Sequence, residues 1–193
     1  MSLLNKEIDD FEGIAYHQNQ FKKITKKDLR SEEQDLLGKW NLFFFYPADF
    51  TFVCPTELED LQEKYQEFKE VNCEIYAIST DTHFVHKMWH DMSDSISKIE
   101  YPMLSDCKHQ LVYDFDVFDE EEGLAQRGSF IIDPDGKIVV YEVNSSGVGR
   151  NADELLRRLH ACQFVYEHGD NVCPAKWKLG EKTIQTTIEN IGK

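Results

Sequence analysis

Cysteine is the most reactive side chain in this sequence, and it occurs at positions 54, 73, 107, 162 and 173. No two of these cysteines form a Cys-x-x-Cys pair, and their spacing matches no zinc-ligand pattern. An odd number of cysteines also cannot pair completely within one chain. In a reducing compartment, such thiols are either core residues or reactive groups, so each position is judged by its surroundings.

Cys54 has surroundings that favour a reactive thiolate. It follows the apolar run Leu42 to Tyr46 and comes directly before Pro55, a residue type favoured at the first position of a helix. A sulfur at a helix N-terminus meets free N–H groups and the positive end of the helix dipole. Both stabilise an anion, and the thiolate is the nucleophilic form of cysteine.

The residues just before Cys54 offer the parts of a pocket. Thr51 has a hydroxyl that can donate a hydrogen bond to a thiolate or to a bound oxygen, and Pro47, Phe50 and Phe52 are expected to keep water out. Glu57 lies in the same helical turn and its negative charge opposes a thiolate, so a basic partner must come from elsewhere in the chain. The alternative is a half-buried cysteine that only caps a helix.

The other cysteines differ in their local sequence. Cys107 is a rival for the reactive role because Lys108 follows it, but no apolar loop surrounds it. Cys73 opens a buried strand and Cys162 lies on the apolar face of the last helix, so both are expected to be small hydrophobic residues of the core. Cys173 lies outside any periodic segment and is expected to be accessible, which favours a role in meeting another thiol.

Three histidines, His83, His86 and His90, are spaced by three and four residues on one predicted helix, a geometry that suits metal ligands. The apolar residues of that helix, which include Phe84 and Met88, fall on the opposite face. We therefore expect the histidines to form a solvated face, with no metal or cofactor. The sequence also lacks a nucleophile elbow and a phosphate-binding loop.

Apolar patterning predicts elements that would position these groups in an α/β fold with a mixed sheet covered by helices on both faces. The predicted strands are 41–46, 74–80, 101–104, 129–132 and 137–143, and the predicted helices are one from residue 54 onwards, 82–92, 108–115 and 151–166. Residues 133–136 have the composition of a hairpin turn. We expect one domain over residues 1–168 and a C-terminal tail over residues 169–193.

The composition excludes several classes of partner. The chain carries 21 basic and 36 acidic residues, a formal net charge of −15, which argues against nucleic acids and anionic membrane surfaces. The longest apolar run, Leu42 to Tyr46, is far shorter than the ~20 residues that span a membrane. The N-terminus has no basic stretch followed by an apolar one, so no signal peptide is expected and the cytoplasm is the expected location.

Four segments resemble the peroxiredoxin family. FYPADFTFVCPTE holds the pattern Pro47-x-x-x-Thr51-x-x-Cys54, and STDTHFVHKMWHD, GLAQRGSFIIDPDGKI and VCPAKW follow in the same order as in that family. The likeness covers nearly the whole chain and is strongest to the typical two-cysteine class, in particular its bacterial alkyl hydroperoxide reductase group. The stretch Arg30 to Leu36 departs from that bacterial pattern, and no role is assigned to it.

The resemblance implies a thioredoxin-like fold, a thiol-dependent peroxidase activity and a role for each matching residue. Cys54 would attack the peroxide and become a sulfenic acid, which would condense with Cys173 of the partner subunit. Thr51 would hydrogen-bond the thiolate and peroxide, and Pro47 would shield the sulfenic acid. Arg127 would supply the missing positive charge, and Glu57 would position it.

The resemblance also implies partners. They are a hydroperoxide substrate, a second copy of the chain in a homodimer, a ring of five such dimers, and a reductant such as thioredoxin or a flavoprotein. Two other functions remain as alternatives. A thiol–disulfide oxidoreductase on the same fold would need the Cys-x-x-Cys pair that is missing, and a non-enzymatic holdase would not need Cys54.

Overall fold

The structure, a computed structural model, describes residues 2–30 and 39–192. The chain divides into two compact units, Met1–Asn151 and Ala152–Lys193, whose positions relative to one another are not determined. The unusual stretch Arg30 to Leu36 falls almost entirely outside the described residues. The functional boundary expected at residue 168 stays a prediction.

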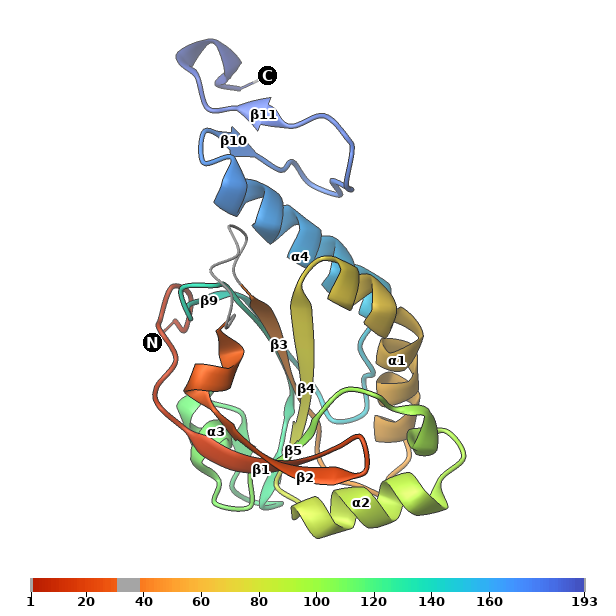
Figure 1. Cartoon of the computed structure of the whole chain (residues 1–193). Coiled ribbons are helices and arrows are strands. Elements are labelled where there is room, and N and C mark those ends of the chain that lie inside the picture. The colour runs from red at the N-terminus through yellow and green to blue at the C-terminus, as the bar shows by residue number, and fades with distance from the viewer. Residues whose placement is uncertain (1, 31–38, 193) are drawn as a thin grey trace. The chain divides into compact units, whose positions relative to one another are not determined.

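A mixed sheet is the centre of the first unit (Figure 1). Its seven described strands run in the order β2-β1-β5-β4-β3-β8-β9. Their bounds are β1 Glu12–His17, β2 Gln20–Thr25, β3 Trp40–Phe45, β4 Cys73–Ser79, β5 Met103–Ser105, β8 Arg127–Ile132 and β9 Ile138–Asn144. A separate small hairpin joins β6, Phe118–Asp119, to β7, Leu124–Ala125. The thioredoxin-like fold expected from the sequence is confirmed.

Strand β3 lies inside this sheet and is buried along its whole length. It pairs in parallel with β4 on one side and antiparallel with β8 on the other. Both faces are covered, which is why its sequence is a continuous apolar run rather than an alternating one. The strand predicted over residues 41–46 is therefore confirmed to within one residue at each end.

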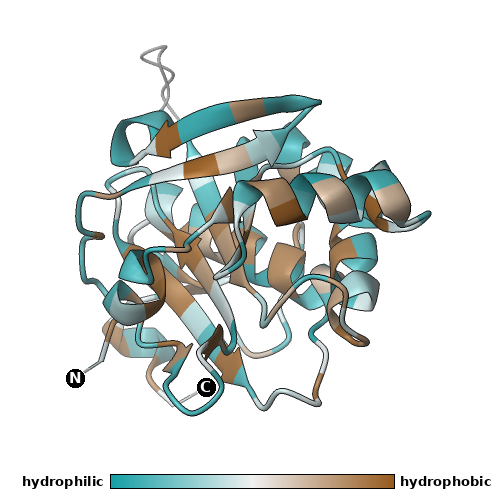
Figure 2. Ribbon diagram, turned by 90° about the horizontal axis from the view of Figure 1, so that it is seen from below, coloured by the Kyte–Doolittle hydropathy of each residue, from teal (hydrophilic) through white to brown (hydrophobic). Residues whose placement is uncertain are grey.

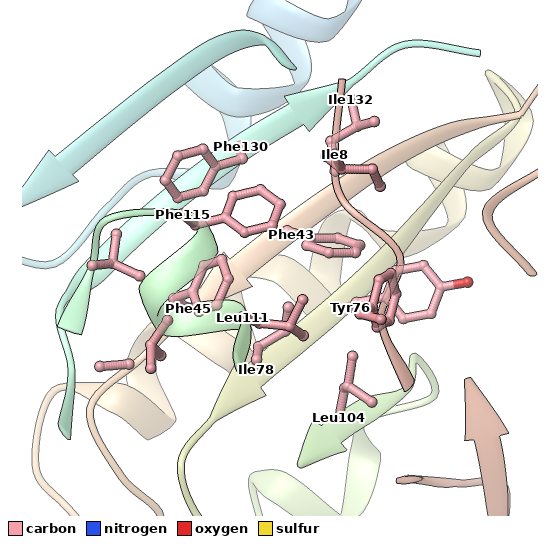
Figure 3. Packing of buried hydrophobic residues seen from close by; sticks show 14 of the residues in the cluster. Ile8, Phe43, Phe45, Tyr76, Ile78, Leu104, Leu111, Phe115, Phe130 and Ile132 are labelled. Atoms are coloured by element: carbon pink, nitrogen blue, oxygen red, sulfur yellow. The ribbon is translucent and has the colours of Figure 1, made fainter. Parts of the chain in front are cut away.

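One face of β3 packs on the aromatic core shown in Figure 3. The ring of Phe43 lies 5.8 Å from that of Phe11, 5.5 Å from Tyr76 and 5.4 Å from Phe115. Phe115 directly follows the short helix α3, Gln110–Asp114, whose Leu111 belongs to the same buried cluster. Helix α3 therefore covers this face of the sheet.

Helix α1, Cys54–Glu70, covers the opposite face. Alternate residues of a strand point to opposite faces, so Phe44 points away from the Phe43 core. The guanidinium carbon of Arg150 lies 3.3 Å from the centre of the Phe44 ring, and the same guanidinium is hydrogen-bonded to Glu57 of α1. The stripe predicted along this helix is buried as expected; it consists of Leu58, Leu61, Tyr65 and Phe68.

The hairpin predicted around residues 133–136 is confirmed between β8 and β9. The Gly136 N–H donates to the Asp133 carbonyl at 2.9 Å. Gly136 has a φ of +82°, a conformation that side chains with a Cβ rarely adopt. The turn therefore depends on a glycine at this position.

Helix α2, His83–Met92, forms where the sequence predicts it, with Thr82 as its N-cap, but only Trp89 of its predicted apolar face is buried. His86 is fully buried and His83 and His90 are half-buried, whereas Phe84, Met88 and Met92 are exposed. Figure 2 views the molecule from the side on which α2 lies. The prediction of a solvated histidine face is wrong, because a carboxylate and a tyrosine hydroxyl inside the unit bind His86.

The second unit begins with helix α4, Ala152–Glu167. Leu155 and Leu159 are buried as predicted, but burial decreases beyond them and Cys162 is only half-buried, so its assignment to the core is wrong. Strands β10, Asn171–Val172, and β11, Ile184–Gln185, form a small hairpin. Between them Trp177 is buried, with its ring 5.3 Å from that of Phe164.

The aromatic core generates the first prediction. Replacing Phe43 with Ala leaves a cavity between the rings of Phe11, Tyr76 and Phe115, and we expect the free energy of unfolding to fall by about 3–5 kcal/mol. Urea denaturation of the reduced protein measures the change. The matched control is Phe52→Ala, which removes the same atoms from a side chain that is 95% exposed and is expected to cost less than about 0.5 kcal/mol. Equal losses in the two variants would contradict the assignment of the core.

Glu154 on α4 generates a pH-dependent prediction. Its carboxylate accepts hydrogen bonds from Arg157 at 2.7 and 2.9 Å and from Arg158 at 2.8 Å. The hydrogen bonds from Arg157, reinforced by Arg158, lower the pKa of Glu154 to about 2. A lowered pKa in the folded state means stabilisation that is complete above the unfolded pKa of about 4.3 and is lost as the pH falls towards 2.

Replacing Glu154 with Gln is therefore expected to lower the melting temperature at pH 7. Both partners are partly exposed, so the loss corresponds to only about 0.5–1 kcal/mol. The difference from wild type should shrink between pH 4.5 and pH 3, which calorimetry at several pH values would measure. Glu167→Gln on the same helix is the control. A difference that grows on acidification would argue against the ion pair.

Candidate active site

Cys54 is the first residue of α1, and its side chain is fully buried. Val53 precedes it as the N-cap and Pro55 follows it, so the expected position at a helix N-terminus is confirmed. The first N–H groups of a helix have no partner within the helix, and they concentrate positive potential at this end. The sulfur therefore lies where an anion is stabilised.

Arg127 provides the positive charge that the sequence around Cys54 lacks. It is the first residue of β8, and its Nη1 donates to the Cys54 sulfur at 3.4 Å. Its Nε donates to the Ser146 carbonyl at 2.7 Å, which fixes the guanidinium from the other side. The guanidinium is almost completely buried, so water weakens its attraction for a thiolate far less than at a surface.

Glu57 holds this arginine in place. It lies one turn after Cys54 on α1 and is buried. Its Oε2 accepts from Arg127 Nη1 at 2.7 Å and from Arg150 Nη2 at 3.0 Å, and its Oε1 accepts from Arg150 Nε at 2.8 Å and from the Arg150 backbone N–H at 2.9 Å. One carboxylate is thus shared between two guanidinium groups.

Arg150 is a member of this network that the sequence reasoning missed. Besides Glu57, it donates to the Gly128 carbonyl at 2.8 Å and to the Ser129 hydroxyl at 3.2 Å. Burial lowers the pKa of Arg150 and Glu57 opposes this shift, but an arginine remains charged. The two arginines and Glu57 carry one excess positive charge, which a thiolate on Cys54 neutralises. No pattern in the sequence links position 150 to position 54.

The loop between β3 and α1 departs from expectation in two details. The hydroxyl of Thr51 donates to the Ala48 carbonyl at 2.9 Å rather than towards the sulfur. Phe52 is 95% exposed and Phe50 is also exposed, so the prediction that these two rings keep water out is wrong. Phe50 has a φ of +56°, so the chain turns sharply at this residue. Pro47 is half-buried at the start of the loop.

A buried polar cluster anchors the start of this loop, and the sequence did not reveal it. The Tyr46 hydroxyl donates to Asp49 Oδ1 at 2.7 Å, and His86 Nδ1 lies 2.8 Å from Asp49 Oδ2. The Asp49 backbone N–H donates to Asp81 at 2.9 Å. These bonds join the loop to α2 and to the end of β4, and they explain why the histidine face of α2 is turned inward.

The remaining cysteines have different surroundings. Cys73 is buried at the start of β4 as predicted, and burial raises the pKa of its thiol. Cys107 is exposed, whereas Cys54 is buried beside a guanidinium, so of these two rivals only Cys54 lies against a buried positive charge. Cys173, in the second unit, is half-buried rather than fully accessible. Its sulfur lies 3.8 Å from the Ala161 carbonyl, and burial raises the pKa of its thiol.

Comparison with known proteins identifies the class of this fold and site. The model of the AhpC/TSA family matches residues 5–141, and that of the C-terminal domain of 1-Cys peroxiredoxin matches residues 161–191. Alkyl hydroperoxide reductase C from Staphylococcus epidermidis is 50% identical over 195 residues, which cover all of both chains. The Bacillus subtilis protein of the same name is 50% identical over 193 residues, again covering all of both chains.

Solved structures agree with these relatives. AhpC from Enterococcus faecalis is 53% identical with a TM-score of 0.84, covering 90% of this chain and 100% of that one. The reduced 2-Cys peroxiredoxin of Plasmodium vivax is 29% identical with a TM-score of 0.91, covering 100% and 97%. The fold is that of the peroxiredoxins, which are thiol-dependent peroxidases. The chain belongs to the AhpC/TSA family and is a peroxiredoxin.

The shared carboxylate generates a prediction about stability. Glu57→Gln removes the negative charge between two buried guanidinium groups, and we expect it to lower the free energy of unfolding by about 3–5 kcal/mol. Urea denaturation under reducing conditions measures the loss.

Glu59→Gln is the matched control for this variant. It makes the same change on the same helix, where Glu59 forms an exposed ion pair with Lys98 at 3.2 Å, and should cost at most about 1 kcal/mol. If the two variants were equally stable, Glu57 would not be the charge on which the site depends.

Proposed function

We propose that Cys54 is the nucleophile that reduces hydrogen peroxide and organic hydroperoxides, in antioxidant defence. The observation that carries this assignment is the 3.4 Å contact of Arg127 Nη1 with a buried sulfur at the start of a helix. A guanidinium and helix N–H groups both favour the thiolate. Cys107, the other cysteine with a basic neighbour, is exposed.

The first step breaks the O–O bond. The Cys54 thiolate attacks the terminal oxygen of R–O–O–H, the sulfur is oxidised to a sulfenic acid, and the other oxygen leaves as R–O⁻ and takes up a proton to become water or an alcohol. Arg127 stabilises the negative charge that passes from the sulfur to the leaving oxygen. Preorganised charge of this kind is commonly the largest contribution to catalysis in a dry site.

Three further residues assist this step in our proposal. Glu57 positions Arg127 through the 2.7 Å hydrogen bond. The hydroxyl hydrogen of Thr51 is donated to Ala48, which leaves the oxygen of Thr51 free to accept the O–H of the peroxide. Pro47, at the start of the same loop, shields the sulfenic acid. The sequence predicts a Thr51 hydroxyl that donates a hydrogen bond to the thiolate. In this proposal Thr51 instead accepts a hydrogen bond from the peroxide.

The second step forms a disulfide between two chains. The thiol of Cys173 of the partner subunit attacks the Cys54 sulfenic acid, an S–S bond forms and water leaves. A reductant with two electrons, such as thioredoxin or a flavoprotein reductase, then restores both thiols. Burial favours the neutral thiol of Cys173, which is consistent with a group that reacts second.

This cycle requires at least a homodimer, and we propose a ring of five dimers. Two features of the first unit support association. Strand β9 lies at an edge of the described sheet, where a second copy can pair with it. The side chains of Phe21, Phe84 and Met88 are exposed, and the rings of Phe21 and Phe84 lie 5.4 Å apart, which makes an apolar surface suited to another interface.

The proposed location is the cytoplasm, where a reductase keeps thiols reduced. Among the described helices, none is both long and apolar enough to cross a membrane. The proposed chemistry uses only cysteine, arginine and peroxide, and it needs no cofactor or metal.

Substitution of the two cysteines tests the cycle. We expect Cys54→Ser to abolish peroxide consumption, because no other thiol has the Arg127 contact. Cys173→Ser should give one fast turnover and no disulfide-linked dimer. An assay of peroxide consumption measures the turnover. Non-reducing gels, run before and after addition of one equivalent of peroxide, measure the disulfide-linked dimer.

Cys107→Ser is the control, and it should behave as the wild type does. An inactive Cys107→Ser variant with an active Cys54→Ser variant would overturn the assignment. Reduction of insulin in the absence of peroxide would instead support the thiol–disulfide oxidoreductase.

A further inference from the structure

A cleft of about 420 Å³ opens in the first unit beside the Cys54 loop. This volume lies within the range of small-molecule sites, roughly 300–1,000 Å³. The cleft is formed by the start of the Cys54 loop, the β6–β7 hairpin, and the end of β9 with the segment that follows it. The peroxide group itself is much smaller than this space, so the chemistry at the sulfur does not account for the cleft.

Two residues join this cleft to the site of reaction. Pro47 lines the cleft and begins the loop that leads to Cys54. Ser146 also lines it, and the Ser146 carbonyl accepts the 2.7 Å hydrogen bond from Arg127, whose Nη1 contacts the Cys54 sulfur. The guanidinium of Arg127 therefore connects the wall of the cleft to the nucleophile.

The lining combines apolar and acidic groups. Leu124 and Val143 contribute apolar side chains, and Asp119 and Glu122 contribute carboxylates. None of the described lining residues is a lysine, an arginine or a histidine. Glu57 and a Cys54 thiolate together balance the charges of Arg127 and Arg150, so these buried groups do not offset the two carboxylates. The field in the cleft is negative.

The hairpin that holds the carboxylates is well defined. Asp119 Oδ1 accepts the backbone N–H groups of Glu121 and Glu122 at 3.1 and 3.2 Å, and the Asp119 carbonyl accepts the N–H of Gly123 at 2.8 Å. Asp119 is thus partly occupied by the turn that it stabilises. Glu122 is exposed and lines the cleft, so it is the carboxylate that an entering molecule meets.

We propose that the cleft holds the organic group of a hydroperoxide while its –OOH group lies at Cys54, and that Glu122 makes the enzyme select neutral hydroperoxides over those that carry a carboxylate. The inference rests on the proposed role of Cys54. Apolar surface in the cleft favours an alkyl or aryl group. A carboxylate on that group would lie within several ångströms of Glu122 and be repelled.

The test compares two substrates that differ by one carboxylate group. They are cumene hydroperoxide and its para-carboxylated derivative. For the wild type and each variant, kcat/KM is measured with both substrates and divided by kcat/KM for hydrogen peroxide. Hydrogen peroxide serves as the internal standard because, bound at Cys54, it has no organic group to occupy the cleft. Repulsion between two carboxylates ~6–8 Å apart near a surface corresponds to roughly a threefold to tenfold lower kcat/KM for the carboxylated substrate. This difference should decrease at high ionic strength.

The decisive variant is Glu122→Gln, and the matched control is Glu121→Gln. Both remove one negative charge from the same turn, but only Glu122 lines the cleft. We expect the wild type to disfavour the carboxylated substrate at least threefold, Glu122→Gln to remove most of that preference, and Glu121→Gln to keep it.

Two results would overturn the inference. One is a wild-type preference of less than twofold, and the other is an equal effect of the two substitutions, which would indicate only the general negative field of the protein. Failure of the proposed function is distinguishable, because the wild type would then consume none of the three peroxides through Cys54.

Discussion

The carboxylate of Glu57 is the constraint on which the site depends. It accepts hydrogen bonds from Arg127 and Arg150, which come from β8 and from the segment before α4, and it is itself fixed on α1 one turn after Cys54. A buried ion pair is stable only when each charge is compensated. The three buried charges of Glu57, Arg127 and Arg150 sum to +1, and Arg127 contacts the Cys54 sulfur. The network therefore holds the elements together and favours the thiolate at the same time.

The register of the sheet brings the arginine to the sulfur. Phe44 of β3 pairs with Ser129 of β8, so the same antiparallel register places Arg127 beside Tyr46, where the chain leaves β3 for the Cys54 loop. A shift by one residue would turn Arg127 to the other face of the sheet. The same register places Phe43 in the aromatic core and Phe44 against Arg150, which connects that core to the site.

The sequence predicts those features of the site that depend on near neighbours. Cys54 at a helix start, the buried strand before it and the turn at Gly136 follow from local residue types. The roles of Arg127 and Glu57 come only from the resemblance to peroxiredoxins. Arg150 could not be predicted, because its partners, Glu57 and the carbonyl of Gly128, are distant in sequence and meet only in the fold.

The inward histidine face of α2 has the same origin. A helical wheel assigns polar residues to water, but the Nδ1 of His86 meets a carboxylate and a hydroxyl inside the unit, and Phe84 and Met88 are left exposed. The exposed Phe84 and Met88 are then available to another surface. An apolar stripe in a helix sequence thus indicates a contact surface. That stripe packs into the core of the same chain or is left for a second molecule, according to whether the polar residues on the other face of the helix find partners inside the fold.

The net charge of −15 and the positive centre at Cys54 act at different distances. Surface charges in salt are screened within about 8–10 Å, so they have little effect on a sulfur buried beside Arg127. They do act on a molecule that crosses the surface. A neutral hydroperoxide passes without loss and, in the proposed mechanism, acquires charge only when the O–O bond breaks beside Arg127. The same chain can therefore be acidic outside, where anions are repelled, and cationic at the one point where an anion is formed.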